Sequence, residues 1–186
     1  MANAKVLVGL TTINDAETNS NWSNLGGGGS PSNEPDYYVQ NIGSVSRTVS
    51  NTLRGFYYDD PAGITTVPVG QHVFIWLYLT GYPAADTTLN GGLRIVLGDA
   101  GASNYKEYYV DGQENLTGGW RCYVVNPQNT ADNTVGTPPT NTFTTWGTRA
   151  NITRVVAKNN LACDVVRVGL GLTVYNGDVG APAGIA

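Results

Sequence analysis

The stretch Cys163-Asp-Val-Val-Arg-Val-Gly-Leu-Gly-Leu-Thr-Val-Tyr175 decides the fold class. Its apolar residues alternate over five positions, which are Val166, Val168, Leu170, Leu172 and Val174. A period of two places these side chains on one face of an extended chain and predicts a half-buried β-strand. A second stretch, Gln71-His-Val-Phe-Ile-Trp-Leu-Tyr-Leu79, is apolar almost throughout and predicts a strand buried on both faces.

Short segments bounded by turn residues fill most of the remaining chain. They predict strands at 5–10, within 36–58, and at 93–97, 105–110, 120–125 and 152–156. We expect 105–110 and 120–125 to pair with each other. No window shows a helical stripe, and 24 glycines and 9 prolines disfavour long helices. The sequence therefore predicts an all-β protein, a two-sheet antiparallel sandwich of the concanavalin A-like jelly-roll type.

The 186 residues divide into three predicted parts. Residues 1–35 are predicted to hold an N-terminal strand and a flexible Gly-rich loop or arm, because four successive glycines favour no fixed conformation. Residues 36–176 are expected to form the sandwich, and 177–186 a tail. Within the sandwich, 126–148 reads as a long loop of the kind that often carries function.

Composition excludes several function classes. Charged residues make up 13% of the chain, the net charge is −4, and Lys and Arg do not cluster, which argues against nucleic-acid binding. No apolar run approaches the ~20 residues of a membrane span. The N-terminus lacks a secretory signal pattern, so we expect synthesis in a cytosol. The Asn-x-Ser/Thr patterns are interpreted as chance.

The sequence shows no set of catalytic residues. The single histidine, His72, begins an apolar strand and is expected to bond to backbone or water. Glu107 has no second acid alternating with it on its strand, as sandwich glycosidases require, so we expect no enzyme activity. Cys122 and Cys163 are interpreted as buried small hydrophobes, and a disulfide requires their strands to be neighbours.

Calcium is the one cofactor that the sequence leaves open. Asp99, Asp111, Glu114 and Asp178 lie in turns, where carboxylates can converge on a cation. The alternative is that these acids cap their own turns. No calcium-binding motif is present, so the expectation is no cofactor, with these acids as weak candidates.

Eleven tyrosines and four tryptophans are the most informative polar feature. Many tyrosines occur as adjacent pairs, and adjacent strand residues face opposite ways, so one ring of each pair is expected outside the core. Aromatic rings with a polar edge suit both sugar stacking and protein interfaces. Trp146 and Trp22 lie near loop junctions, where each is expected either to fill the core or to anchor a partner. The candidate contact residues are Trp22, Tyr37, Tyr57, Tyr108, Tyr123 and Trp146.

Several segments resemble known families. The succession His72–Tyr78, Leu93–Asp99, Tyr105–Val110 and Gly118–Val125 resembles the strands of concanavalin A-like, laminin-G-like jelly rolls. The stretch Glu34-Pro-Asp-Tyr-Tyr-Val-Gln-Asn-Ile-Gly-Ser-Val-Ser46 resembles the opening of virion structural proteins of tailed phages. This resemblance implies a capsid decoration or cement protein, located in the virion and oligomeric, with a trimer favoured. Its partner would be the major capsid protein or another virion protein.

Two alternatives remain beside that interpretation. One is a tail or fibre component of the same particle. The other is a lectin-like carbohydrate-binding module that holds glycans with its aromatic side chains.

Overall fold

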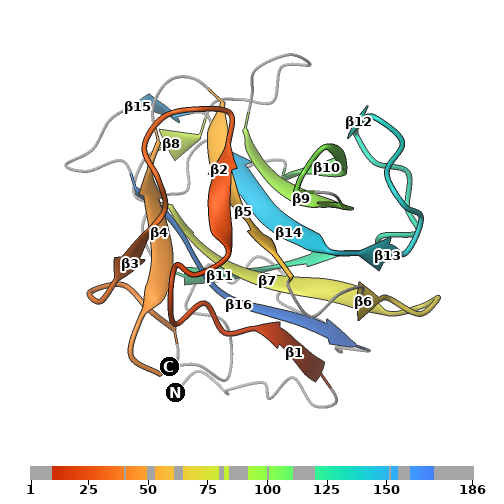
Figure 1. Cartoon of the computed structure of the whole chain (residues 1–186), viewed down its shortest axis with the longest axis horizontal. Helices are drawn as coiled ribbons and strands as arrows, with labels where there is room; N and C mark the ends of the chain where they lie inside the picture. Colours follow the sequence, from red (N-terminus) through yellow and green to blue (C-terminus); the bar gives the residue numbers. More distant parts are fainter. Residues whose placement is uncertain are drawn as a thin grey trace.

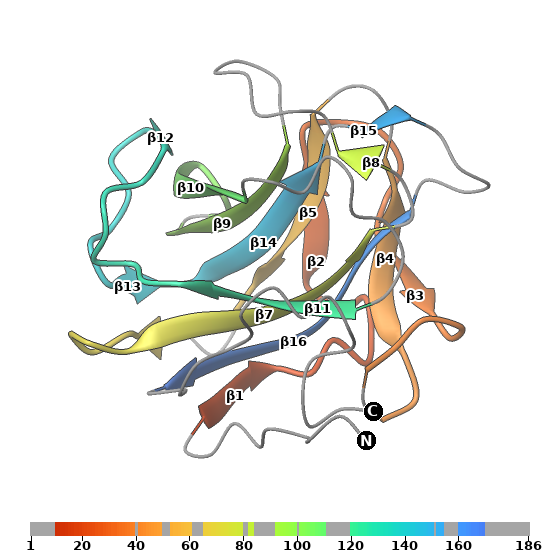
Figure 2. The same cartoon turned by 180° about the vertical axis from the view of Figure 1, so that it is seen from behind.

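The computed structural model describes residues 10–39, 41–49, 53–60, 65–79, 82–83, 92–99, 101–110, 120–150, 152–154 and 160–169. Within these ranges the regular structure is entirely β, and the strand pairs are antiparallel. Two large, twisted sheets pack face to face (Figure 1, Figure 2). The predicted all-β sandwich is confirmed. The same ranges hold no helix long and apolar enough to cross a membrane.

The first sheet has the strand order β11-β7-β16-β4-β3, and β1 pairs with β16. The long strand β16 changes its partner along one edge. Its start, Asn160–Cys163, pairs with β4, and Val166–Gly169 pairs with β1. The strands of this sheet are β1 (Leu10–Asn14), β3 (Ser32–Glu34), β4 (Ser44–Thr48), β7 (His72–Leu79), β11 (Trp120–Val125) and β16 (Asn160–Gly169).

The second sheet has the order β12-β10-β9-β14-β5-β2. Two short ladders, β13 with β6 and β15 with β8, lie outside both sheets. The strands of the second sheet are β2 (Trp22–Leu25), β5 (Arg54–Asp59), β9 (Leu93–Asp99), β10 (Asn104–Val110), β12 (Asn133–Val135) and β14 (Thr145–Ala150). The ladder strands are β6 (Thr65–Thr66), β8 (Tyr82–Pro83), β13 (Thr142–Phe143) and β15 (Ile152–Arg154).

The main core lies between the sheets and follows the alternation of the strands. β7 turns Val73, Ile75 and Leu77 into this core, while Phe74 and Trp76 belong to a second cluster on the outer face of the first sheet. All five side chains are buried. The predicted burial of this strand on both faces is therefore confirmed.

Two predictions for the middle of the chain are wrong. Strands β10 and β11 do not pair, because β10 lies between β9 and β12 in the second sheet and β11 lies beside β7 in the first. Residues 126–148 are not one loop, since they contain β12, β13 and the start of β14. β14 was missed because its inward side chains, Trp146, Thr148 and Ala150, do not form an apolar alternation.

The proposed division at residue 35 does not correspond to a structural boundary. β1, β2 and β3 belong to the same two sheets as the strands that follow. The Gly-rich loop is also bonded to the first sheet, because Arg47 of β4 donates hydrogen bonds to the carbonyl oxygens of Leu25 and Gly27. Most of the expected strand at 5–10 and the tail at 177–186 fall outside the described residues.

Candidate functional site

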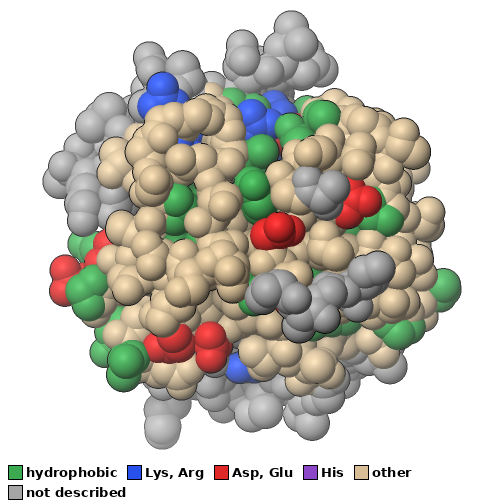
Figure 3. Space-filling model, in the orientation of Figure 1, with side chains coloured by type: hydrophobic (Ala, Val, Ile, Leu, Met, Phe, Trp, Pro, Cys, Tyr) green, Lys and Arg blue, Asp and Glu red, His purple; other side chains and the backbone are tan. Residues whose placement is uncertain are grey.

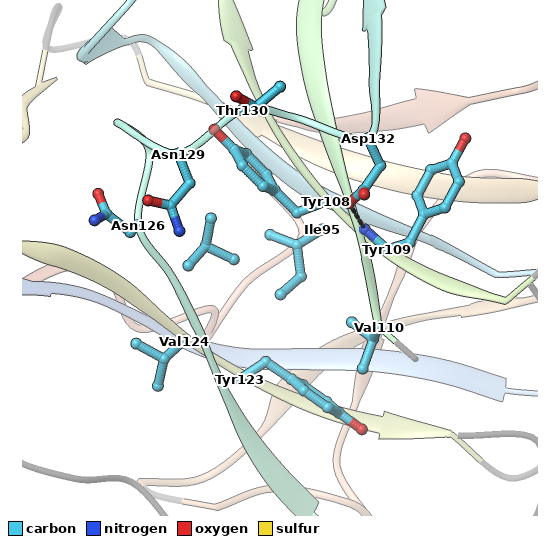
Figure 4. Close-up of a pocket in the computed structure, with 11 residues that line it drawn as sticks. Ile95, Tyr108, Tyr109, Val110, Tyr123, Val124, Asn126, Asn129, Thr130 and Asp132 are labelled. Carbon is cyan, nitrogen blue, oxygen red and sulfur yellow. Dashed lines mark hydrogen bonds between the residues drawn. The ribbon is translucent and has the colours of Figure 1, made fainter. Parts of the chain in front are cut away.

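A pocket of about 380 Å³ opens where β10 of the second sheet faces β11 of the first. Its walls come from the inward faces of these strands, and its polar side comes from the turns that follow β11. Figure 4 shows Tyr108 and Ile95 on one side of the space and Tyr123 on the other. The lining residues are Ile95, Tyr108, Tyr109, Val110, Tyr123, Val124, Val125, Asn126, Asn129, Thr130 and Asp132.

Strand alternation explains which tyrosine rings reach the pocket. Tyr108 faces the core between the sheets, and Tyr123 packs against the same core from the opposite sheet. Tyr109 faces the other way: its ring lies over the guanidinium of Arg94, whose Cζ is 4.1 Å from the ring centroid. In Figure 4 this ring accordingly points away from the other two tyrosines. Tyr108 and Tyr123 are therefore the rings that line the pocket from its two sides, with Tyr123 half-buried and Tyr108 only 8% exposed.

The polar side of the pocket consists of Asn126, Asn129, Thr130 and Asp132. Two hydrogen bonds fix this segment: the N–H of Asn129 donates to the carbonyl of Asn126 at 3.0 Å, and the Asp132 carboxylate accepts the N–H of Tyr109 at 2.8 Å. The side chains of Asn129 and Thr130 are exposed and have no hydrogen-bond partner within the described ranges. Their amide and hydroxyl groups are free to bind a ligand.

Lys106 anchors the segment that carries these polar groups. Its Nζ donates to the carbonyl oxygens of Pro127 at 3.1 Å and Thr140 at 2.9 Å. The Tyr108 hydroxyl donates to the same Pro127 oxygen at 3.2 Å. Burial lowers the pKa of Lys106. These bonds join both ends of the 127–140 segment to β10, so the pocket's polar side is held in place.

The two pocket tyrosines remain protonated well above neutral pH. Burial raises the pKa of Tyr108 to about 12, with a smaller contribution from the negative charge of Asp132. Burial also raises the pKa of Tyr123 to about 12. At neutral pH both rings therefore present a neutral phenol rather than a phenolate.

A buried ion cluster lies on the outer face of the second sheet. Glu107, whose side chain is 0% exposed, accepts bonds from Arg94 and Arg149, each at 2.7 Å, and from Asn133 at 2.9 Å. Burial alone would raise the pKa of Glu107, but the bonds from Asn133 and Arg149 and the two positive charges outweigh it and lower the pKa. Glu107 is thus an ionised structural residue with no access to a substrate.

The structure separates the predicted contact residues into three groups. Tyr108 and Tyr123 come together in the pocket. Tyr37 stacks on Tyr78 across the outer face of the first sheet, with centroids 4.9 Å apart, and Tyr57 lies on the outer face of the second.

Trp22 and Trp146 are core residues, 7% and 0% exposed, so of the two alternatives expected for them the structure supports filling of the core and not anchoring of a partner at the surface. Both tryptophans pack with Tyr58 between the sheets.

The polar residues of the pocket were missed by reasoning from sequence. Their only signal was that 126–148 resembled a long functional loop. The residues Asn126, Asn129, Thr130 and Asp132 belong to no motif, and their convergence on Tyr108 depends on the sheet packing.

Those remaining candidate groups that the structure describes form neither a metal cluster nor a disulfide. Asp99 accepts a bond from the Asn104 amide at 3.0 Å, as a turn cap does. Across the described part of the chain no three His, Cys, Asp or Glu side chains gather to hold a metal ion. Asp111, Glu114 and Asp178 lie outside it.

The two cysteines are free thiols. They lie on β11 and β16, which flank β7, so the strands are not neighbours and the condition for a disulfide is not met. Burial raises the pKa of Cys122. His72 is half-buried and lies edge-on to Phe74, with ring centroids 6.5 Å apart.

Comparison with known proteins identifies the fold. No family model and no curated sequence matches the chain. A family 11 carbohydrate-binding module from Clostridium thermocellum, solved with a β-1,3-1,4-mixed-linked tetrasaccharide, superposes with a TM-score of 0.57 at 12% identity. The match covers 95% of this chain and 98% of that one. The chain has the fold of β-sandwich carbohydrate-binding modules.

Other solved structures add to this picture to different degrees. Carbohydrate-binding modules of the β-sandwich superfamily with promiscuous specificity match with a TM-score of 0.53 at 13% identity, covering 90% of this chain and 63% of that one. The enzymatically active domain of a bacteriophage CBA120 tailspike protein matches with a TM-score of only 0.42 at 14% identity, covering 83% of this chain and 20% of that one. So weak a likeness carries no argument, and the virion role stays a prediction.

Proposed function

We propose that this protein is a carbohydrate-binding module that holds a short saccharide in the pocket between β10 and β11. The observation that carries the proposal is the pairing of two tyrosine rings from opposite sheets, Tyr108 and Tyr123, beside a polar side of amides, a hydroxyl and a carboxylate. Aromatic rings pack against the apolar faces of sugar rings, and the polar groups bind sugar hydroxyls. The fold shared with carbohydrate-binding modules supports this proposal over the capsid-decoration interpretation.

The size and charge of the pocket narrow the ligand class. Its volume of about 380 Å³ is near the small end of the range of about 300–1,000 Å³ usual for small-molecule pockets. Among the described residues that line it, Asp132 is the one charged side chain. A short, neutral saccharide fits these features better than a long or acidic chain.

The proposal is binding without catalysis. Hydrolysis of a glycosidic bond ordinarily uses two carboxyl groups about 5–9.5 Å apart that flank the bond. The described lining of the pocket includes one carboxylate, Asp132, which accepts a backbone N–H bond, and Glu107 is closed off by its two arginines. These contacts support a site that holds a sugar and leaves it unchanged.

A glycan array, run with and without added calcium, identifies the ligand, and calorimetry on the best hits measures affinity. Asn129→Ala removes an exposed amide at the pocket, and Tyr123→Phe removes one phenol hydroxyl while keeping the ring. We expect at least one of these variants to bind the sugar tenfold more weakly. Tyr38→Ala is the matched control, because Tyr38 is 46% exposed and lies outside the pocket. Absence of any glycan ligand, or equal affinity of all variants, would sink the proposal.

A further inference from the structure

Two arginines meet beneath the Gly-rich loop, at the side of the sandwich away from the pocket. Arg47 extends from β4 of the first sheet and Arg54 begins β5 of the second. A side-chain nitrogen of each lies close to the position that a Cβ on Gly28 would take, at 2.7 Å for Arg47 and 3.0 Å for Arg54. The fold therefore holds two positive charges close together in a protein whose net charge is −4.

The two arginines differ in their partners. Arg47 is 2% exposed, and its guanidinium donates to the carbonyl oxygens of Leu25, Gly27 and Gly55. Arg54 is half-buried and makes no hydrogen bond or ion pair with any residue that the structure describes. Burial lowers the pKa of Arg47, and the positive charge of Arg54 lowers it further. No described carboxylate offsets this pair of charges.

The loop itself supplies further donors. Two of its carbonyl groups already accept hydrogen bonds, since the Gly27 oxygen accepts from Arg47 and the Gly28 oxygen accepts from the Asn24 amide at 3.2 Å. The N–H groups of Gly27, Gly28 and Gly29 have no partner in the described part of the chain, and all three residues are exposed. Gly27 and Gly28 have φ values of 73° and 91°, which side chains rarely tolerate, so this backbone shape requires glycine.

Figure 3 shows the face of the molecule that is turned to the viewer in Figure 1. Most of the Lys and Arg side chains visible on it gather at its upper edge, where the loop after β2 runs in Figure 1. The rest of that face consists mainly of neutral polar side chains and backbone. A local excess of positive charge beside free N–H groups is the chemistry that recognises an anion.

We propose that Arg54 and the N–H groups of Gly27, Gly28 and Gly29 bind an oxyanion, namely a sulfate, phosphate or carboxylate group, with Arg47 supplying a second positive charge from beneath. The planar fork of a guanidinium matches two oxygens of such a group, and exposed backbone N–H groups complete its coordination. The oxyanion is either a free inorganic ion or the acid group of a charged glycan. This site lies on β5, two strands from β9 of the pocket, so it is independent of the proposed sugar site.

The test is the stabilisation of the protein by millimolar sodium sulfate, compared with sodium chloride at equal ionic strength. We expect sulfate to raise the melting temperature of the wild type, and Arg54→Gln to need at least tenfold more sulfate for the same rise. Arg121→Gln, which removes a cation from β11, is the matched control and should respond as the wild type does. The variants are essential because concentrated sulfate stabilises any folded protein by exclusion from its surface. An equal response of Arg54→Gln and wild type overturns the proposal.

A second arm distinguishes the two sources of the oxyanion. A sulfated oligosaccharide and its desulfated counterpart are titrated into the wild type and Arg54→Gln by calorimetry. Tenfold tighter binding of the sulfated sugar than of inorganic sulfate, lost in Arg54→Gln, assigns the site to a charged glycan. Equal affinities for both assign it to a free ion. Asn129→Ala separates this site from the pocket, because it should keep the sulfate response whether or not the pocket binds sugar.

Discussion

Replacement of Glu107 by Gln tests whether the buried ion cluster holds the second sheet together. The carboxylate is fully buried and joins Arg94 on β9, 3% exposed, to Arg149 on β14, 15% exposed, with both contacts at 2.7 Å. Gln keeps the shape but removes the charge, so two guanidiniums lose their counter-ion. Removing one partner of a buried ion pair costs about 3–5 kcal/mol. For a chain of this size that corresponds to a melting temperature lower by about 6–20 °C.

Urea unfolding followed by tryptophan fluorescence measures this change, with Asp36→Asn as the control. Asp36 is an exposed carboxylate, so its loss should change the free energy of unfolding by less than about 0.5 kcal/mol. The pKa of Glu107 is lower in the folded protein than in the unfolded chain. Its contribution is therefore fully present above pH ~4.3, the ordinary value for Glu, and is lost as the pH falls through the folded-state pKa. The difference between wild type and Glu107→Gln should shrink on acidification. A neutral-pH change as small as that of Asp36→Asn would refute the reasoning.

Three further outcomes follow from the packing. The pKa values of Tyr108 and Tyr123 are about 12 in the folded protein and ~10 in the unfolded chain. Since the unfolded chain therefore loses these protons first, each tyrosine should lower the free energy of unfolding by up to roughly 2–3 kcal/mol as the pH rises from 10 to 12. Urea titrations at pH 9 and 11.5 should show a smaller loss in the corresponding Phe variants. Gly147→Ala should destabilise by about 1–3 kcal/mol or more, because its Cβ would collide with the Phe56 carbonyl on the neighbouring strand, which thermal melting can check. Reductant should leave the melting temperature unchanged, because both cysteines are free thiols. Alkylation under denaturing conditions should accordingly label both of them without prior reduction.

The strands that sequence predicted well are those whose burial is visible in their apolar pattern. β7, β9 and the described part of β16 place large aliphatic residues in the core, and a hydrophobic pattern reports such burial directly. β14 shows where this logic fails, because it is a central strand whose buried side chains include Thr145 and Thr148. The Thr148 hydroxyl donates to the Arg94 carbonyl at 2.9 Å, so a polar residue is satisfied inside the sheet.

Strand pairing was the weakest part of the prediction, and it concealed the site. Sequence neighbours pair often, but β10 and β11 belong to different sheets, so their inward residues face each other across the core instead of lying side by side. Tyr108 and Tyr123 could be chosen as contact candidates because they are tyrosines on predicted strands. That they form opposite walls of one pocket follows only from the three-dimensional packing of the sheets.

The pocket lies beside β10 and β11, and not on the outer face of the second sheet, because that outer face is covered by its own side chains. Two glycines on that face lie directly against tyrosines of the neighbouring strands. A Cβ added at Gly98 would lie 2.7 Å from the Cβ of Tyr105, and one added at Gly147 would lie 2.8 Å from the Cβ of Tyr57. Tyr105 is 8% exposed, and Glu107 beside it is inaccessible. The face is thus covered by its own side chains, and opening it to a sugar would require breaking the Glu107 ion pairs. At the β10 edge the exposed side chains of Asn129 and Thr130 have no hydrogen-bond partner in the described part of the chain, so the proposed binding of a sugar there would break no ion pair.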